Sequence, residues 1–286
     1  MKRAFRPGRP RRVGLLALAV VAVSGTIAAT AYSVITPFPK NRSAEPIAKA
    51  FADDPKQVTD AFFSVIPPRG NPAAVSTTRL AAFPRAGKSF AILSTGDARL
   101  ASRKNTSEST GKANLGPFIR GARDVTIMRT FLRVPKGASC LSIRFRFLSD
   151  EFPEFVNEDF NDAFIAELDG STWEASADRG NDQGKPDENR DPTISAPKNF
   201  AQDAKGNPIR VNTVGDTSVT AKAAKGTTYD GATRLLRAST PITPGRHSLY
   251  LSIFDQGDRD FDSAVFLDRL TLDDRSPCRS GAVKDS

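Results

Sequence analysis

The 286-residue sequence has little of several residues on which common active sites depend: one histidine, two cysteines, one tryptophan and three tyrosines. A zinc site built from cysteine and histidine needs four ligands, whereas His247, Cys140 and Cys278 supply three, far apart in the chain. No motif around His247 supports a Ser-His-Asp or Cys-His catalytic arrangement. Glycine-rich phosphate- or dinucleotide-binding motifs and internal repeats are also missing. These absences argue against zinc, nucleotide-dependent and triad enzymes.

Nearly all of the net charge of +9 lies in the N-terminal residues 1–42. Eight of the 41 Lys and Arg residues lie in residues 1–42, which contain no acidic residue, so 33 basic residues face 32 acidic ones in residues 43–286. A nearly neutral body lacks the basic surface that nucleic-acid binding requires. We therefore expect no nucleic-acid partner.

The same segment predicts export. Arg11 and Arg12 precede the apolar stretch 13–23, and Ala29-Thr30-Ala31 fits a cleavage site, which makes residues 1–31 a candidate signal peptide. Alternatively, residues 13–35 stay uncleaved and span the membrane as a signal anchor, since 23 helical residues at about 1.5 Å each can cross a hydrocarbon core of about 30 Å. Either interpretation places the body outside the cytoplasm, secreted or tethered to the cell surface.

Export places the two cysteines in an oxidising compartment, where disulfides form. They are predicted to form one disulfide, Cys140–Cys278, which would tie the C-terminal end of the chain to the core. The alternative is two free thiols.

Apolar and polar residues alternate with a period of two through the body. In residues 141–147, Leu141, Ile143, Phe145 and Phe147 are predicted to face one side of a strand and the polar residues the other. Further strands are predicted at residues 90–94, 126–134, 163–168, 209–214, 246–254 and 264–272.

Other segments complete the predicted architecture. A short helix is expected from residue 54 or 55 to about 65, and residues 175–207 are expected to form a long polar surface loop. The whole predicts an all-β fold, a β-sandwich or jelly roll. The predicted domain organisation is a linker at residues 32–51, one domain at residues 52–275 and a C-terminal tail at residues 276–286.

Two acidic segments, residues 149–162 and 255–263, directly follow predicted strands. Packed carboxylates repel one another and are costly to bury unpaired, and calcium binds carboxylate, amide and carbonyl oxygens. The segments therefore predict a calcium site. Its candidate ligands are Asp150, Glu151, Asn161, Asp162, Asp255, Asp258, Asp260 and Asp262. In an extended segment, Asp258, Asp260 and Asp262 would face the same side. The alternative is two solvated acidic turns, or acids paired with arginines.

Four elements of the sequence together resemble the choice-of-anchor L domain. They are residues 91–98, residues 145–155 with 160–164, residues 229–233, and residues 253–258 with 262–266. They occur in the family's order, although Asp150 and Phe152 stand where the family pattern has Glu and Tyr. The resemblance implies an extracellular, surface-associated bacterial β-sandwich. Residues 279–286 contain no sorting motif, so we expect any anchor at residues 13–35.

These observations predict an exported, non-enzymatic module that acts in surface attachment, adhesion or the extracellular matrix. Calcium is its expected cofactor, and an extracellular surface protein or a polysaccharide its expected partner. Contact with a membrane is expected only through residues 13–35, if these stay uncleaved. The alternative is a carbohydrate-binding or glycan-hydrolysing protein that uses carboxylates of the acidic segments, for example Glu151 with Asp255 or Asp258.

The glycan alternative would also need aromatic side chains that stack on sugar rings. Trp173 and Tyr250 are the candidates for stacking on a sugar. His247 lies on the apolar face of its predicted strand, so we expect it to be structural.

Overall fold

The computed structural model describes the backbone of residues 35–37, and residues 43–104, 116, 118–158, 160–176, 193–257 and 259–285. The chain divides into residues 1–32 and one unit of residues 33–286. The predicted signal or anchor segment and Asp258 therefore lie outside the described residues. Within the described residues, no helix is long and apolar enough to cross a membrane.

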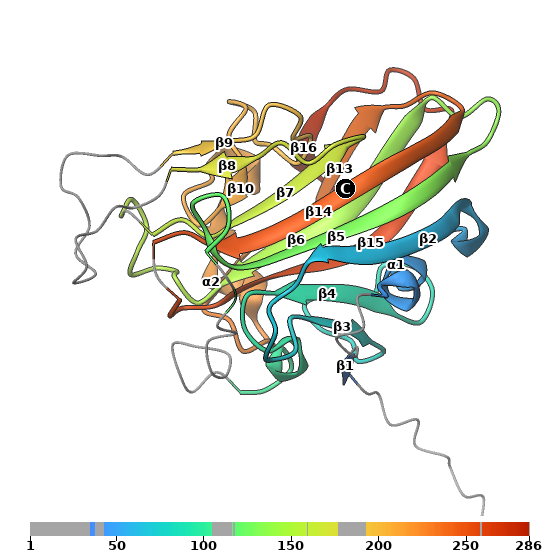
Figure 1. Ribbon diagram of the computed structural model, residues 1–286. Coiled ribbons are helices and arrows are strands. Elements are labelled where there is room, and N and C mark those ends of the chain that lie inside the picture. Colours follow the sequence, from blue (N-terminus) through green and yellow to red (C-terminus); the bar gives the residue numbers. More distant parts are fainter. Residues whose placement is uncertain are drawn as a thin grey trace, which may run out of the picture. The chain divides into compact units, whose positions relative to one another are not determined.

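Two antiparallel sheets pack face to face, which confirms the predicted all-β sandwich (Figure 1). The smaller sheet has five strands in the order β10-β7-β14-β5-β2. Its strands are β2 (Val58–Val65), β5 (Arg123–Val134), β7 (Ala163–Leu168), β10 (Ile209–Arg210) and β14 (Gly245–Asp255).

The larger sheet has nine strands, with a main path β1-β3-β4-β15-β6-β12-β11 and with β13 joining β6 to β16. Its strands are β1 (Ile35–Pro37), β3 (Ala73–Ser76), β4 (Phe90–Ser94), β6 (Cys140–Ser149), β11 (Val219–Thr220), β12 (Gly231–Thr233), β13 (Leu236–Pro241), β15 (Ser263–Asp273) and β16 (Gly281–Lys284). The remaining elements are α1 (Glu45–Phe51), α2 (Ala221–Ala224), the 3₁₀ turns η1 (Pro55–Gln57), η2 (Ala98–Leu100) and η3 (Gly215–Thr217), and the two-stranded pair β8 (Glu174–Ala175) and β9 (Ile194–Ser195).

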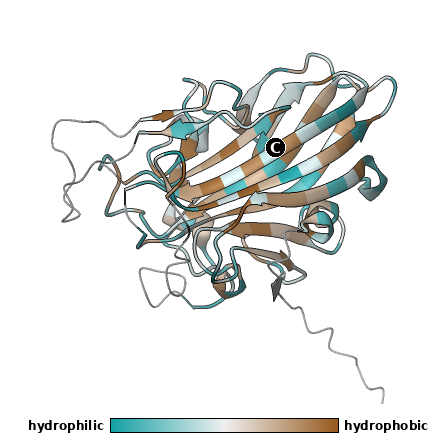
Figure 2. Cartoon of the chain, in the orientation of Figure 1, coloured by the Kyte–Doolittle hydropathy of each residue, from teal (hydrophilic) through white to brown (hydrophobic). Residues whose placement is uncertain are grey.

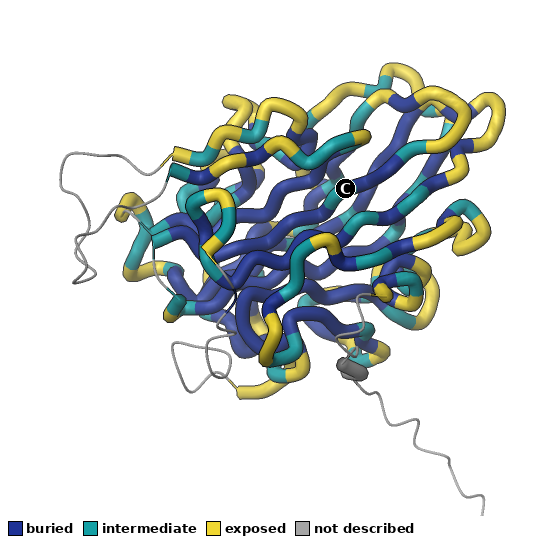
Figure 3. Tube along the Cα trace, in the orientation of Figure 1, coloured by how far each residue is buried: buried dark blue, intermediate teal, exposed yellow. Residues whose placement is uncertain are grey.

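The main core lies between the two sheets. As predicted, Leu141, Ile143, Phe145 and Phe147 of β6 all point into it. From the smaller sheet, Phe164 packs against Phe145 with 5.0 Å between the ring centroids. Hydrophobic colour is concentrated along the strands, and the same strands form the buried interior (Figures 2 and 3). Burial of these apolar side chains is the main force that holds the sheets together.

The larger sheet is buried on its outer face too. Phe83, Phe90 and Phe266 form a second cluster there, with ring centroids between 5.1 and 5.9 Å apart. This explains why all five residues of β4 are buried, since a strand covered on both faces reads as one apolar run.

The predicted helix at residues 54–65 is wrong beyond Gln57. Pro55 starts only the turn η1, and the chain then enters β2, which pairs with β5. Val58, Phe62 and Val65 would share one face of a helix, but β-branched and aromatic residues also suit a strand. Pairing with β5 supplies backbone hydrogen bonds along the whole segment.

Two other segments differ from expectation. The predicted strand 209–214 shortens to β10, because the chain turns at Thr213, whose N–H donates to the Arg210 carbonyl. The predicted surface loop 175–207 is exposed at residues 204–207, but the prediction is wrong for residues 199–201. Phe200 and Ala201 are buried there, and the Asn199 side chain accepts a hydrogen bond from the Ala166 N–H of β7.

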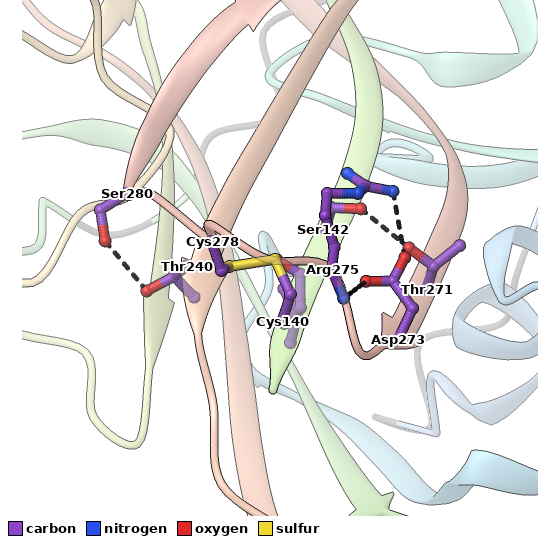
Figure 4. The surroundings of a disulfide bond; sticks show 9 residues. Cys140, Ser142, Thr240, Thr271, Asp273, Arg275, Cys278 and Ser280 are labelled. Carbon is purple, nitrogen blue, oxygen red and sulfur yellow. Dashed lines mark hydrogen bonds and ion pairs between the residues drawn. A yellow bond between two sulfur atoms is a disulfide. The ribbon is translucent and has the colours of Figure 1, made fainter. Parts of the chain in front are cut away.

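The predicted disulfide is confirmed. Cys140 and Cys278 are bonded, with 5.5 Å between their Cα atoms. Hydrogen bonds flank the bridge on both sides, from Arg275 to Asp273 and between Thr240 and Ser280 (Figure 4). The bond joins the first residue of β6 to the segment between β15 and β16, and so fastens the C-terminal strand to the larger sheet.

Candidate functional site

Strand pairing brings parts of all four elements of the family resemblance together at one end of the larger sheet. Ser149, the last residue of β6, pairs in register with Gly231 of β12 and with Ser263 of β15. Thr95 follows β4, and its N–H donates to the Ser263 carbonyl at 3.0 Å while its hydroxyl accepts from the Ser263 N–H at 2.9 Å. Segments that lie far apart in the sequence therefore form one structural unit.

Hydrogen bonds join the two acidic segments directly. The Asp150 N–H donates to the Asp262 carbonyl at 3.1 Å, and the Gln256 N–H donates to Asp162 Oδ1 at 3.2 Å. Within the first segment, the Asp162 N–H donates to Glu151 Oε2 at 3.3 Å. The two acidic segments therefore meet in the structure, which the sequence alone does not predict.

Most of the candidate ligands are buried at this meeting point. The side chains that are no more than 3% exposed are Asp150, Glu151, Asn161, Asp162, Asp255 and Asp262. Asp260 is exposed, so the expectation that Asp260 and Asp262 face the same side is wrong. Phe261, between them, has a φ of 46°, which breaks the extended conformation that the alternation requires.

Burial and mutual repulsion dominate the electrostatics of the cluster. Burial, followed by the charges of Asp230 and Asp262, raises the pKa of Asp150 to about 9. Burial, followed by the charges of Asp162 and Asp262, also raises the pKa of Asp255 well above its ordinary value. It is therefore unfavourable for these carboxyl groups to be ionised at the same time.

The carboxylates of Asp150 and Asp255 are poorly compensated. The Asp230 N–H approaches Asp150 and the Thr95 hydroxyl approaches Asp255, which lowers each pKa somewhat. Within the described residues, however, none of the four carboxylate oxygens has a hydrogen-bond partner of normal geometry. Uncompensated burial of this kind destabilises a fold unless a proton or a cation neutralises the charge.

Among the described residues, the positive charges recorded near this cluster act on Asp124 at its margin. Burial raises the pKa of Asp124, and the Gly116 N–H, which donates to Asp124 Oδ1 at 2.6 Å, lowers it in part, followed by the charges of Arg259 and Arg123. The pKa of Asp150 is governed instead by burial and by neighbouring carboxylates.

Gln256 adds neutral polar atoms at the same place. Its side chain is fully buried, and its Oε1 and Nε2 atoms have no hydrogen-bond partner within the described part of the chain. No group of three or more His, Cys, Asp or Glu side chains among those residues is arranged to hold a metal ion. Calcium also accepts amide and backbone carbonyl oxygens, of the kind that Gln256 and Asn161 carry.

The two candidate sugar-stacking residues have different environments. Trp173 is fully buried, stacks on Phe254 with 4.1 Å between ring centroids and donates its Nε1–H to Ser252, so its expected role is wrong. Tyr250 is half-buried on the outer face of the smaller sheet. Sequence patterns predict which residues alternate, but a tryptophan covered by a distant strand leaves no local signal.

His247 has the structural role expected for it. Its Nδ1 lies 2.6 Å from Asp169 Oδ2, and its Nε2 lies 2.9 Å from the Thr243 carbonyl. Both ring nitrogens are therefore engaged.

Gly231 is required by close packing at the site. A Cβ atom at this position would lie 2.5 Å from Phe152 Cβ and Cγ and 2.6 Å from Val219 Cγ1. We expect Gly231→Ala to lower the unfolding free energy by about 1–3 kcal/mol, the usual cost of overpacking. Urea unfolding of the variant and of the wild type would measure this loss. An unchanged stability of Gly231→Ala would contradict the packing.

Comparison with known proteins adds one assignment. A family model described as the choice-of-anchor L domain matches residues 69–273, more than half of the chain. No curated protein matches.

Solved structures show only distant likeness. One is a carbohydrate-binding module, TmCBM61 in complex with β-1,4-galactotriose, at 7% identity over 82% of this chain and 97% of that chain, with a TM-score of 0.29. Another is the K2 cleaved adhesin domain of Lys-gingipain, at 8% identity over 84% of this chain and 98% of that chain, also with a TM-score of 0.29. At these scores the likeness supports no argument about function.

Proposed function

We propose, since the chain belongs to the choice-of-anchor L domain family, that it is a non-enzymatic attachment module whose two acidic segments are ordered by calcium. Membership of this family makes it a cell-surface or extracellular protein. Its partner in attachment would be an extracellular surface protein or a polysaccharide.

One observation carries the calcium part of the proposal: Asp150 and Asp255 are each 1% exposed, and their carboxylate oxygens have no hydrogen-bond partner of normal geometry within the described residues. A divalent cation would remove the repulsion between them and their acidic neighbours. Calcium suits these irregular segments better than magnesium, because it takes six to eight oxygen ligands in flexible geometry, whereas magnesium demands a near-ideal octahedron.

Burial of the same carboxylates supports a non-enzymatic role. A glycan hydrolase must bring two carboxyl groups to opposite sides of a glycosidic bond. Asp255 is too deeply buried to meet a polysaccharide, and Glu151, also 1% exposed, already accepts the Asp162 N–H.

Calorimetric titration of the full chain with calcium tests the proposal, with magnesium as the control. We expect saturable calcium binding with a Kd of about 10⁻⁴ to 10⁻³ M, typical of extracellular modules. Protons should be released on binding, because the ligands must be deprotonated. Absence of calcium binding, or equal binding of magnesium, would overturn the calcium part.

The raised pKa of Asp150 predicts a pH dependence in the calcium-free protein. An unfolded Asp loses its proton near pH 4, whereas folded Asp150 keeps it to about pH 9. Between these values the native state binds more protons than the unfolded state, so the unfolding free energy falls as the pH rises. The slope is at most about 1.4 kcal/mol per pH unit for one carboxyl group.

Urea unfolding in chelator from pH 5 to pH 9 measures this dependence. The pKa of Asp255, Asp124 and Asp268 is also raised, so these groups add to the same trend. Asp150→Asn should flatten the curve. A stability that rises towards pH 9 would contradict the account.

A further inference from the structure

The outer face of the smaller sheet is divided into two parts. At one part, Trp173 packs onto Phe254 and, with Ile127 and Ile165, forms a buried apolar cluster. At the other part, the outward residues of β2, β5 and β14 other than the buried Ser248 are half-buried or exposed, and hydrophilic and hydrophobic residues alternate along these strands (Figures 2 and 3).

One arginine organises the aromatic side chains of that surface. Phe62, Arg129 and Tyr250 lie in register on three neighbouring strands. The Arg129 guanidinium lies 4.3 Å from the ring centroid of Phe131, 5.2 Å from that of Tyr250 and 5.9 Å from that of Phe62. Stacking of this kind holds the rings and the charge side by side on a rigid sheet.

Two more arginines continue the surface towards the end of the strands. Arg133 of β5 and Arg246 of β14 are directly opposite each other, and both are exposed. Like charges directly opposite on two strands are destabilising, so this pair needs a reason other than stability. With Phe131 and His247 they line a surface pocket of about 290 Å³.

Negative charge on this surface is limited. Asp60 borders the pocket, and its carboxylate accepts the N–H of Ala61. The Asp169 carboxylate contacts the His247 ring through Oδ2 and accepts a hydrogen bond from the Ser248 N–H through Oδ1. Glu167 of β7, opposite Tyr250, is fully buried and accepts hydrogen bonds from Thr172. These carboxylates are therefore engaged within the chain, whereas the guanidinium groups of Arg133 and Arg246 are exposed to a ligand.

We propose that this surface, formed by Phe62, Arg129, Phe131, Arg133, Arg246 and Tyr250 and here called the arginine platform, binds an acidic polysaccharide. Half-buried aromatic rings can stack on sugar rings, and a guanidinium group binds a carboxylate through two parallel hydrogen bonds. A pocket of about 290 Å³ is at the lower end of the range for small-molecule sites, which suits one sugar residue. The inference rests on the proposed attachment role and names its ligand class.

Binding of the full chain to polygalacturonate tests this inference, with neutral dextran and double-stranded DNA as comparison polymers. We expect binding to polygalacturonate that weakens as salt rises from 50 to 300 mM, because the arginines are accessible to screening ions. No binding to polygalacturonate, or equal binding to dextran or to DNA, would overturn it.

Charge reversal locates the binding surface. Arg133→Glu with Arg246→Glu should weaken binding at least tenfold. The control, Arg103→Glu with Arg234→Glu, makes the same change in charge at exposed residues outside the platform and should leave binding within twofold. Tyr250→Ala should also weaken binding without changing the net charge. Unchanged binding in the first double variant would overturn the proposal.

The two proposals fail separately. Asp255→Asn should lose the response to calcium but keep its binding to polygalacturonate, because Asp255 lies outside the platform. A protein that binds calcium but no acidic polysaccharide would keep the proposed calcium role and lose the platform.

Discussion

Asp255→Asn is expected to raise the melting temperature in chelator and to abolish the rise that calcium produces. In the calcium-free protein, folding at neutral pH must either give Asp255 a proton or bury its charge beside Asp162 and Asp262, and asparagine requires neither. In the wild type, calcium at 100 times its Kd should add about 2.7 kcal/mol to the unfolding free energy. At about 2–4 °C per kcal/mol for a chain of this size, that is a rise of several degrees.

The matched control for this prediction is Asp260→Asn. Asp260 belongs to the same acidic segment but is exposed. In this variant, the calcium-induced gain in unfolding free energy should stay within about 1 kcal/mol of the wild-type gain, because an exposed ionic interaction contributes at most about that much. A variant lacking Asp255 that still gains several degrees with calcium would contradict the proposed ligand set.

Replacing both Cys140 and Cys278 by alanine is expected to have the largest effect on stability. The bridge closes a loop with a sequence separation of 138 residues. The chain-entropy model gives about 5 kcal/mol for a loop of this length, and removal of native disulfides typically costs about 2–5 kcal/mol. Urea unfolding of the double variant measures the loss, and reduction of the wild type should reproduce it.

The double variant should nevertheless keep the native fold. The C-terminal strand β16 pairs with β13, and Asp285 forms ion pairs with Arg144 and Arg237. These contacts hold the C-terminal segment in place without the covalent bond. A stability within about 0.5 kcal/mol of the wild type would show that the bridge contributes little beyond them.

The strands were predictable because their signal is local. Residues 90–94 and 163–168 match β4 and β7, and residues 141–147 lie inside β6, since alternation or a short apolar run is visible in the sequence itself. The error at residues 58–65 has the opposite cause. That segment is compatible with both structures by pattern, and its pairing with β5 decides between them.

The candidate site was predictable in composition but not in detail. The acidic segments stood out because they follow apolar strands, and β6 and β14 do deliver Asp150 and Asp255 to a common place. The exposure of Asp260 could not be foreseen, because it follows from the backbone turn at Phe261. The arginine platform was missed for a similar reason: Phe62, Arg129 and Tyr250 become neighbours only when three strands pair in register.

The most direct test of the central claim is a thermal melt of the full chain with calcium, with magnesium and with chelator, at pH 5.5 and at pH 8. Calcium must displace protons from the buried carboxyl groups, so its effect depends on pH. We expect a rise with calcium alone, larger at pH 8 than at pH 5.5. An equal rise with magnesium, or no rise at either pH, would show that protons and not calcium neutralise Asp150 and Asp255.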